Sequence, residues 1–260
     1  MMTPLDDVSA AFLQIHLSKT YDARYTFDMA SLSIDDAYEV QHRMIAARVA
    51  RGEEVVGYKV GCTSKAIRRQ FGLAEPICGR VMAPHVFHGN TVLNWHDYVC
   101  CAVEPEFVFV IAKDLSNEIT DDQQLVGAIE YISPGIEIHN HKFWFGKPTL
   151  QELIASNGIH AGLVVGAARV RPEGLDLDME GVGLFKNGEL AASGIGAEIM
   201  GGPLKSVRWL ANHLLRCGEH LKAGQIVIPG SAVELVAVEP EDRVSVQFTH
   251  VGRVEADFCA

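Results

Sequence analysis

The chain has 260 residues, of which 33 are acidic and 22 are Lys or Arg, so its formal net charge at pH 7 is −11. Hydrophobic residues make up 48% and charged residues 21%, which is ordinary globular usage and excludes an intrinsically disordered chain. Because no basic excess can neutralise phosphates, the charge argues against a nucleic-acid binder and against docking on an anionic membrane.

The cysteines and the N-terminus indicate a cytoplasmic protein. Six cysteines are scattered without a C-x-x-C pair, which suits neither a disulfide scaffold nor a structural zinc site. The N-terminus carries acids where a signal peptide needs a basic region, and no stretch approaches the ~18 apolar residues of a membrane span. We therefore expect reduced thiols and no membrane segment.

The first 50 residues are predicted to be helical. Ser33 and Asp36 resemble a capping box with Asp in place of Glu, followed by apolar residues spaced for one helical face. The only boundary we expect falls near residue 51, between an N-terminal helical region (1–50) and a catalytic domain (51–260).

Strands and short helices follow in irregular order. Short apolar runs predict strands at 55–61, 91–95, 98–112, 135–139 and 161–166. Capping and stop residues predict helices at 63–72, at 120–132 with Pro134-Gly135 as the stop, at 148–157 and at 203–217. An Asn187-Gly188 turn predicts a hairpin, and the segments 225–230, 233–240 and 243–258 read as β. This order favours a mixed α/β (α+β) domain over a doubly wound sheet.

Two carboxylates share one face of a predicted apolar strand. Glu104 and Glu106 are two residues apart, so in a strand both side chains point to the same side. Buried together they would repel each other unless a divalent cation bound them through oxygen. The alternative is that both are solvated at a strand entrance, since Pro105 suggests a strand beginning, a bulge or an edge.

A third acid changes the balance between these alternatives. Glu137 lies in the short apolar strand 135–139, where a charge is out of place unless it faces the surface. Three acids in two apolar strands favour a metal cage of Glu104, Glu106 and Glu137 around Mg²⁺ or Mn²⁺. A metal with open positions would act there as a Lewis acid toward substrate oxygens.

Longer blocks of the chain resemble the 2-hydroxydienoate hydratases of the fumarylacetoacetate hydrolase superfamily. The blocks are, in order, VVGYKVGCTSKAIRRQFG, EPEFVFVIAKDL, AIEYISPGIEI, KNGEL, GGPLKSVRWLANHL and LKAGQIVIPG. The resemblance runs from about residue 38 to the C-terminus. It implies a β-rich fold with an N-terminal helical layer, in a metal-dependent and usually oligomeric enzyme, hence a homo-oligomer. It also implies a small 2-oxo or 2-hydroxydienoic acid substrate from aromatic-compound degradation.

The resemblance also assigns roles to single residues. It places the family's metal carboxylates on Glu104, Glu106 and Glu137, and the family lysine on Lys59. Lys59 would then hold a substrate carboxylate or stabilise an enolate oxygen, whereas without the resemblance it could be a strand residue with its amine in water. Ser231 falls in a loop that borders the pocket in relatives.

The chain departs from the family pattern after the third carboxylate. Where hydratases often read I-V-D-S-R, this chain has Asn140 for the Asp and Lys142 for the Arg, with His139 and His141 added. Lys142 could bind a substrate carboxylate as a point charge. Either histidine could be a general base for water, or both could be packing residues; a role as a further metal ligand is also open.

These departures lead to a preferred function and its alternatives. The preferred prediction is metal-dependent hydrolysis of a carbon–carbon bond in an acylpyruvate of the maleylpyruvate or fumarylpyruvate type, giving pyruvate and a carboxylic acid. The alternatives are hydration of 2-hydroxypenta-2,4-dienoate (2-oxopent-4-enoate) or a relative, decarboxylation of a 2-oxo acid, and an inactive metal-binding subunit that supports a partner enzyme.

Overall fold

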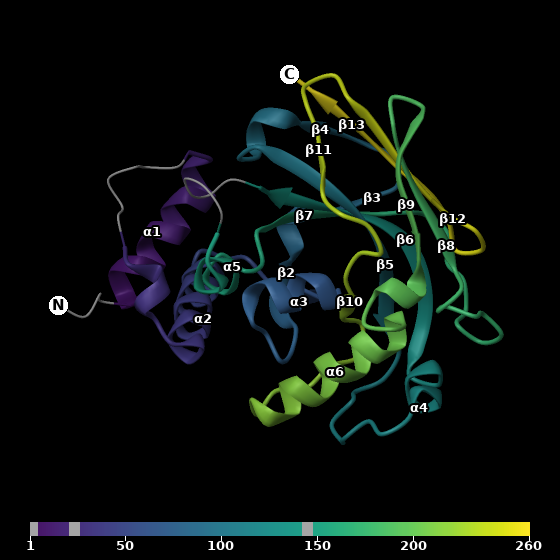
Figure 1. Cartoon of the computed structure of the whole chain (residues 1–260), viewed down its shortest axis with the longest axis horizontal. Helices are drawn as coiled ribbons and strands as arrows, with labels where there is room; N and C mark the ends of the chain where they lie inside the picture. The colour runs from purple at the N-terminus through teal and green to yellow at the C-terminus, as the bar shows by residue number, and fades with distance from the viewer. Residues whose placement is uncertain (1–4, 21–26, 142–147) are drawn as a thin grey trace.

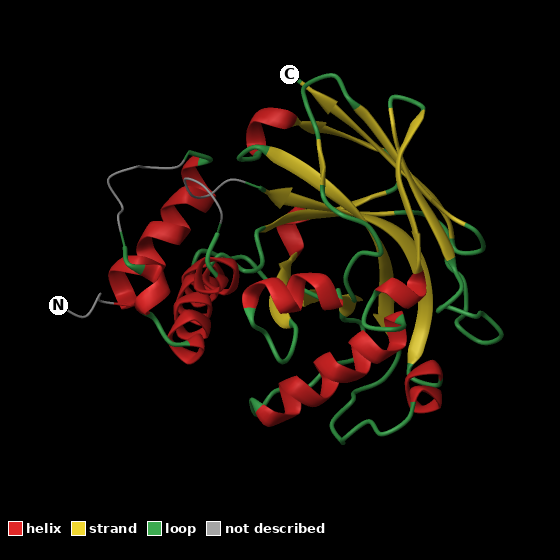
Figure 2. Cartoon of the chain, viewed as in Figure 1, coloured by secondary structure: helices red, strands yellow, loops and turns green. Residues whose placement is uncertain are grey.

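The computed structural model describes residues 5–20, 27–141 and 148–260. Helices α1 (Leu5–Ser18), α2 (Ile34–Ala50) and α5 (Leu150–Ala155) gather at one end of the molecule, and the strands fill the other (Figures 1 and 2). The remaining helices are α3 (Lys65–Phe71), α4 (Asp122–Val126), α6 (Pro203–Arg216) and four short 3₁₀ turns, including η2 (Ala83–His85). No helix among the described residues is long and apolar enough to cross a membrane.

The strands form two mixed sheets. The larger has eight strands, in the order β2-β1-β10-β5-β6-β7-β3, with β11 pairing on β5. Its members are β1 (Val55–Gly61), β2 (Ile77–Met82), β3 (Val86–His88), β5 (Cys101–Ile111), β6 (Ile129–Asn140), β7 (His160–Val165), β10 (Ile226–Ile228) and β11 (Val236–Ala237). The smaller is ordered β4-β13-β12-β8-β9. It contains β4 (Thr91–Asn94), β8 (Gly181–Lys186), β9 (Glu189–Ile195), β12 (Arg243–Phe248) and β13 (Gly252–Cys259).

The main hydrophobic core lies between the two sheets. Phe107 of β5 packs against Phe248 of β12, with ring centroids 4.5 Å apart, and α6 contributes Val207 and Leu210 to the same core. Because side chains alternate along a strand, the neighbours of Phe107 on β5 point to the opposite face of the large sheet. That second face carries a smaller apolar cluster and the candidate metal centre.

The N-terminal helices form a layer with its own small core. Ser33 caps α2 in a reciprocal arrangement with Asp36, as the capping-box pattern predicts. Val8, Phe12 and Met44 pack there with Met82 of β2 and Ala155 of α5. The mixed α/β fold with an N-terminal helical layer is thus confirmed. The boundary at residue 51 stays a prediction, because the layer shares this core with later segments.

One predicted helix is wrong. The segment 120–132 was expected to be helical up to Pro134-Gly135, but α4 covers only Asp122–Val126 and β6 runs through the proposed stop. Ile129, Ile132 and Ile136 are β-branched and buried in the core between the sheets. Pairing with β5 along the whole of β6 outweighs the weak helical spacing, since tertiary contacts override local propensity.

Other local predictions hold. The hairpin β8–β9 turns at Asn187 and Gly188, both with positive φ, as a type I′ turn requires. Helix α6 begins at Pro203. All six cysteines are free thiols.

Gly57 provides a test of how closely β1 approaches β10. Its Cα pairs with Ile226, and a Cβ at this position would collide with the carbonyl oxygen of Ile226. We expect Gly57→Ala to lower the free energy of unfolding by about 1–3 kcal/mol, the usual range for overpacking. Gly127→Ala is the matched control, because its Cβ would lie 3.8 Å from the nearest atom, and it should change stability by under about 0.5 kcal/mol. Equal urea midpoints for the two variants would contradict the close-approach explanation.

Candidate metal centre

The pairing of β5 with β6 brings the acids of the two strands together. Glu104 is the direct antiparallel partner of Glu137, while Ala102 pairs with His139 and Glu106 with Gly135. Glu104 and Glu106 therefore share a face with Glu137 and His139. Gly135 leaves room beside this group, since a Cβ there would lie 2.5 Å from Val108 Cγ2.

Three of these side chains converge closely enough to share one ion. Ligand atoms of Glu104, Glu137 and His139 all lie within 4.8 Å of one another. His139 Nε2 is 3.2 Å from Glu104 Oε2 and 3.5 Å from Glu137 Oε2. The side chain of Glu104 is 20% exposed, whereas those of Glu137 and His139 are at most 2% exposed. Glu104 therefore marks the open side of the group.

Lys59 supplies the positive charge of the group. Its Nζ lies 2.7 Å from Glu137 Oε1 and donates a hydrogen bond to the Gly158 carbonyl at 3.1 Å. Burial opposes the charge of Lys59, but attraction to Glu137 and Glu104 outweighs burial and raises its pKa. The pKa of Glu137 falls well below its usual range, because Lys59 and His139 outweigh the effect of burial. The pair is therefore fully ionised.

His160 is a further partner of Glu137. Its Nδ1 lies 2.7 Å from Glu137 Oε1, and the ring is buried at the start of β7. Burial lowers the pKa of His160 in spite of the neighbouring carboxylate, so the ring is neutral at pH 7 and its Nδ1–H donates to Glu137. Lys59 and His160 together fix one oxygen of Glu137 and leave Oε2 facing the cluster.

Glu106 is held by the loop that joins β10 to β11. The Gly230 amide donates to Glu106 Oε2 at 3.1 Å. On the edge of β5 opposite β6, the strand pairs with β11 at Val103 and with β10 at Phe109. Pro105 lies between these two pairings. The sequence suggests a strand beginning, a bulge or an edge at Pro105. β5 begins at Cys101 and has no bulge at Pro105, and only the gap between these two pairings gives Pro105 an edge-like position in an internal strand. Burial, with repulsion from Glu137 and Glu104, raises the pKa of Glu106 well above its usual range.

The donor atoms of this group fit a divalent cation. Glu106 Oε1, Glu137 Oε2 and both ring nitrogens of His139 are buried and form no hydrogen bond with any described atom. Each such atom costs about 1–3 kcal/mol when left unpaired. A cation would satisfy the carboxylate oxygens and one of the two His139 nitrogens and would offset the carboxylate repulsion, and ligands that are mostly carboxylate oxygens suit Mg²⁺ or Mn²⁺.

A strained segment carries two of the partners to the site. Asn157, Gly158 and Ile159 have φ values of 62°, 64° and 54°, and the left-handed region is costly for a β-branched residue such as Ile159. Asn157 anchors the segment by accepting a hydrogen bond from Arg80 N at 2.7 Å and donating one to Arg80 O at 2.9 Å. The turn presents the Gly158 carbonyl to Lys59 and places His160 beside Glu137.

The other residues that the sequence placed in the site lie near the ligand group without joining it, or lie outside the described residues. His141 is half-buried just past the end of β6, with its amide on the Cys100 carbonyl at 3.3 Å, and it is not part of the ligand group. Ser231 follows Gly230 and accepts a hydrogen bond from Val233 N at 3.1 Å. Lys142 lies outside the described residues. Sequence reasoning missed His160, because only the β6–β7 pairing brings it to Glu137.

Sequence comparison places the chain among hydratases and decarboxylases. No family model matches it. A 2-keto-4-pentenoate hydratase of Paraburkholderia xenovorans is 32% identical over 227 residues, which cover 87% of this chain and 84% of the relative. A 4-oxalocrotonate decarboxylase of Pseudomonas putida is 30% identical over 235 residues, covering 90% and 89% of the two chains.

Solved structures agree with these relatives. A 4-oxalocrotonate decarboxylase from Pseudomonas putida G7, complexed with magnesium and adipate, has a TM-score of 0.91 and 29% identity over 99% of both chains. The same enzyme has also been solved with calcium and acetate. A fumarylpyruvate hydrolase from Pseudomonas aeruginosa has a TM-score of 0.62 at 16% identity, covering 78% of this chain and 88% of the hydrolase, so that likeness shows the fold alone. The predicted cofactor class, a divalent cation, is confirmed by the ligand group and these complexes.

The preferred prediction of an acylpyruvate hydrolase is wrong. Relatives that match most of the chain at 30% identity or more are hydratases and decarboxylases. The prediction rested on the retained carboxylates and on His139 or His141 as a general base, and the relatives, not the positions of these histidines, overturn it. The fold is shared with a fumarylacetoacetate hydrolase from Exiguobacterium antarcticum, which has a TM-score of 0.61 at 15% identity. The chain is an enzyme of the family of 2-keto-4-pentenoate hydratases and 4-oxalocrotonate decarboxylases.

Proposed function

We propose that the chain is a divalent-metal-dependent lyase that adds water to a small unsaturated 2-oxo acid such as 2-hydroxypenta-2,4-dienoate (2-keto-4-pentenoate). The observation that carries this proposal is the group of Glu104, Glu137 and His139, in a chain 32% identical to a 2-keto-4-pentenoate hydratase. Bound there, Mg²⁺ or Mn²⁺ would act as a Lewis acid toward the carboxylate and 2-oxo oxygens of the substrate.

Lys59 orients the centre and offers a donor to the substrate. An ammonium group has three N–H donors, and Glu137 Oε1 and Gly158 O take two of them. The third can reach an oxygen of an anionic substrate. Together with a bound divalent ion, Lys59 would offset the nearby carboxylates, so a net charge of −11 does not exclude a carboxylate substrate.

His139 is the proposed proton acceptor for the attacking water. Its ring nitrogens are buried and form no hydrogen bond with other described atoms, so one that does not bind the ion is available to water. Glu104, on the open side, lies 3.2 Å from Nε2 and marks the approach for water. The ligand set of Glu104, Glu106 and Glu137 and the pocket roles of His141, Lys142 and Ser231 stay predictions.

Decarboxylation of a 2-oxo dicarboxylic acid is the second candidate. The specific observation in its favour is the TM-score of 0.91, over 99% of both chains, to a 4-oxalocrotonate decarboxylase. That reaction needs stabilisation of the negative charge left by carbon dioxide, but no base for water. The two candidates therefore differ in their products and in their dependence on His139.

Product analysis tests the proposal directly. The full chain with Mg²⁺ is incubated with 2-hydroxypenta-2,4-dienoate and, separately, with 4-oxalocrotonate. We expect a 4-hydroxy-2-oxo acid from the first, and no activity after chelation until Mg²⁺ is restored. Release of carbon dioxide from 4-oxalocrotonate without hydration of the dienoate would replace the first candidate with the second. Turnover that is unaffected by chelation would contradict the metal-dependent proposal.

His139→Ala separates a base from a metal ligand. As the base, its loss should lower kcat by about 10²–10⁴-fold while the Mg²⁺ concentration for half-maximal activity is unchanged. The exposed His96 provides the control His96→Ala, which should match the unmodified chain in both quantities. An increase in the half-maximal Mg²⁺ concentration of His139→Ala would show that the ring is a ligand instead.

Lys59→Met tests the charge balance of the centre. Removing one partner of this buried ion pair should cost about 3–5 kcal/mol of unfolding free energy in metal-free protein, because Glu137 is left unpaired. Mg²⁺ should restore part of the loss. Lys186→Met, which breaks a more exposed pair with Asp242, should cost under about 1 kcal/mol with or without Mg²⁺. Similar losses for the two variants in urea unfolding would refute the special role of Lys59.

A further inference from the structure

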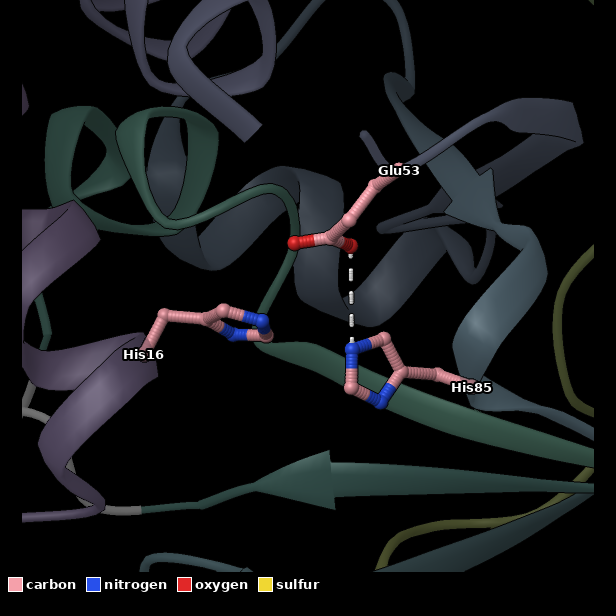
Figure 3. Close-up of side chains that lie close together, drawn as sticks. All are labelled: His16, Glu53 and His85. Carbon is pink, nitrogen blue, oxygen red and sulfur yellow. Dashed lines mark ion pairs between the residues drawn. The ribbon is translucent and has the colours of Figure 1, made fainter. Parts of the chain in front are cut away.

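A second group of potential ligands lies between the N-terminal helices and the large sheet. His16 comes from the end of α1, Glu53 from the segment between α2 and β1, and His85 from η2 (Figure 3). Their ligand atoms lie within 4.8 Å of one another. His85 Nε2 is 3.8 Å from Glu53 Oε2, and the two imidazole rings meet edge to face with centroids 5.3 Å apart. Three elements distant in sequence therefore converge on one point.

The two imidazoles are largely buried without hydrogen-bond partners among the described residues. His16 is 7% exposed and the His85 side chain 25% exposed, yet neither ring forms a hydrogen bond with another residue of the described chain. The separation of 3.8 Å between His85 and Glu53 is too long for a hydrogen bond. Burial lowers the pKa of His16 to about 2 and that of His85 to about 4, so both rings are neutral and keep a lone pair.

Arg48 fixes the third member of the group. Its Nε lies 3.1 Å from both oxygens of Glu53, and its Nη2 lies 2.6 Å from Oε2. Such an outer partner orients a carboxylate ligand, and the oxygens keep a free lone pair because a carboxylate has about four acceptor positions. Because Arg48 neutralises Glu53, the two imidazoles must supply most of the affinity for an ion.

We propose that His16, Glu53 and His85 form a second cation site that binds a borderline divalent ion such as Zn²⁺ and joins α1 to the sheet. Two imidazoles and one carboxylate are a common zinc ligand set, and imidazole favours Zn²⁺ over Mg²⁺. Ligand atoms around tetrahedral Zn²⁺ lie about 3.3 Å apart. His85 and Glu53 would therefore close by about half an ångström, and the pairs with His16, which lie within 4.8 Å, by up to about 1.5 Å. The proposal requires that the side chains rotate by this amount when the ion binds.

This site differs in kind from the candidate catalytic centre. The centre around Glu104 and Glu137 is dominated by carboxylates and takes an ion that prefers oxygen. The second group is dominated by nitrogen and carries no excess negative charge. Excess Mg²⁺ should therefore occupy the first without filling the second.

Zn²⁺ stoichiometry in the full chain tests the proposal. Metal-free protein is dialysed against Zn²⁺ in the presence of excess Mg²⁺, and bound zinc is measured for the unmodified chain, His85→Ala and His16→Gln. We expect each variant to bind one equivalent fewer than the unmodified chain. His88→Ala, at an exposed position three residues from His85, is the matched control and should bind the same amount as the unmodified chain.

Two further measurements keep the test decisive. Co²⁺ should give visible absorption bands in the unmodified chain that are weaker in both variants, and Zn²⁺ should raise Tm less in the variants than in His88→Ala. Far-ultraviolet circular dichroism shows whether each variant is folded, and one folded variant is enough for the comparison with the unmodified chain. Equal zinc stoichiometry in the unmodified chain and a folded variant would overturn the proposal and leave His16 and His85 as a packing pair.

Discussion

The antiparallel pairing of β5 with β6 is the constraint on which the rest of the centre depends. It places Glu104 opposite Glu137 and sends both carboxylates away from the core that Phe107 and Ile136 enter. Like charges placed directly opposite on neighbouring strands destabilise a sheet. The pairing is therefore favourable only with positive charge nearby, and the neighbouring strands and loops provide it or leave room for an ion.

The partners that resolve this repulsion come from parts of the chain far apart in sequence. Lys59 of β1 and His160 of β7 hold one oxygen of Glu137, and the Gly230 amide holds one oxygen of Glu106. These partners occupy Glu137 Oε1 and Glu106 Oε2. The other two oxygens, Glu137 Oε2 and Glu106 Oε1, form no hydrogen bond with any described atom. The protein thus orients its acids with fixed partners and leaves the balance of charge to a cation.

Sequence patterns correctly predicted the structural features that are set by residues close together along the chain. Alternation placed Glu104 and Glu106 on one face, and the capping residues located α2. The pattern failed at 120–132, where burial of Ile129 and Ile132 between the sheets outweighs helical spacing. It also could not find His160, because the only local signal is a histidine after Asn157-Gly158, and its contact with Glu137 arises from strand pairing. Nor could His139 and His141 distinguish hydrolysis from hydration, since a histidine can serve as the base for water in either reaction.

The alternation along β6 from Tyr131 to Ile138 has a consequence for the evolution of the chain by insertion and deletion. Losing one residue between Ile132 and Ile136 would turn Glu137 into the apolar core and bring an isoleucine to the ion site. Length changes in the segment between β5 and β6, at 112–128, would leave that register intact. Divergent members of this lineage should therefore differ in length around α4, while the spacing inside β6 stays constant even where the residues flanking the third acid are replaced.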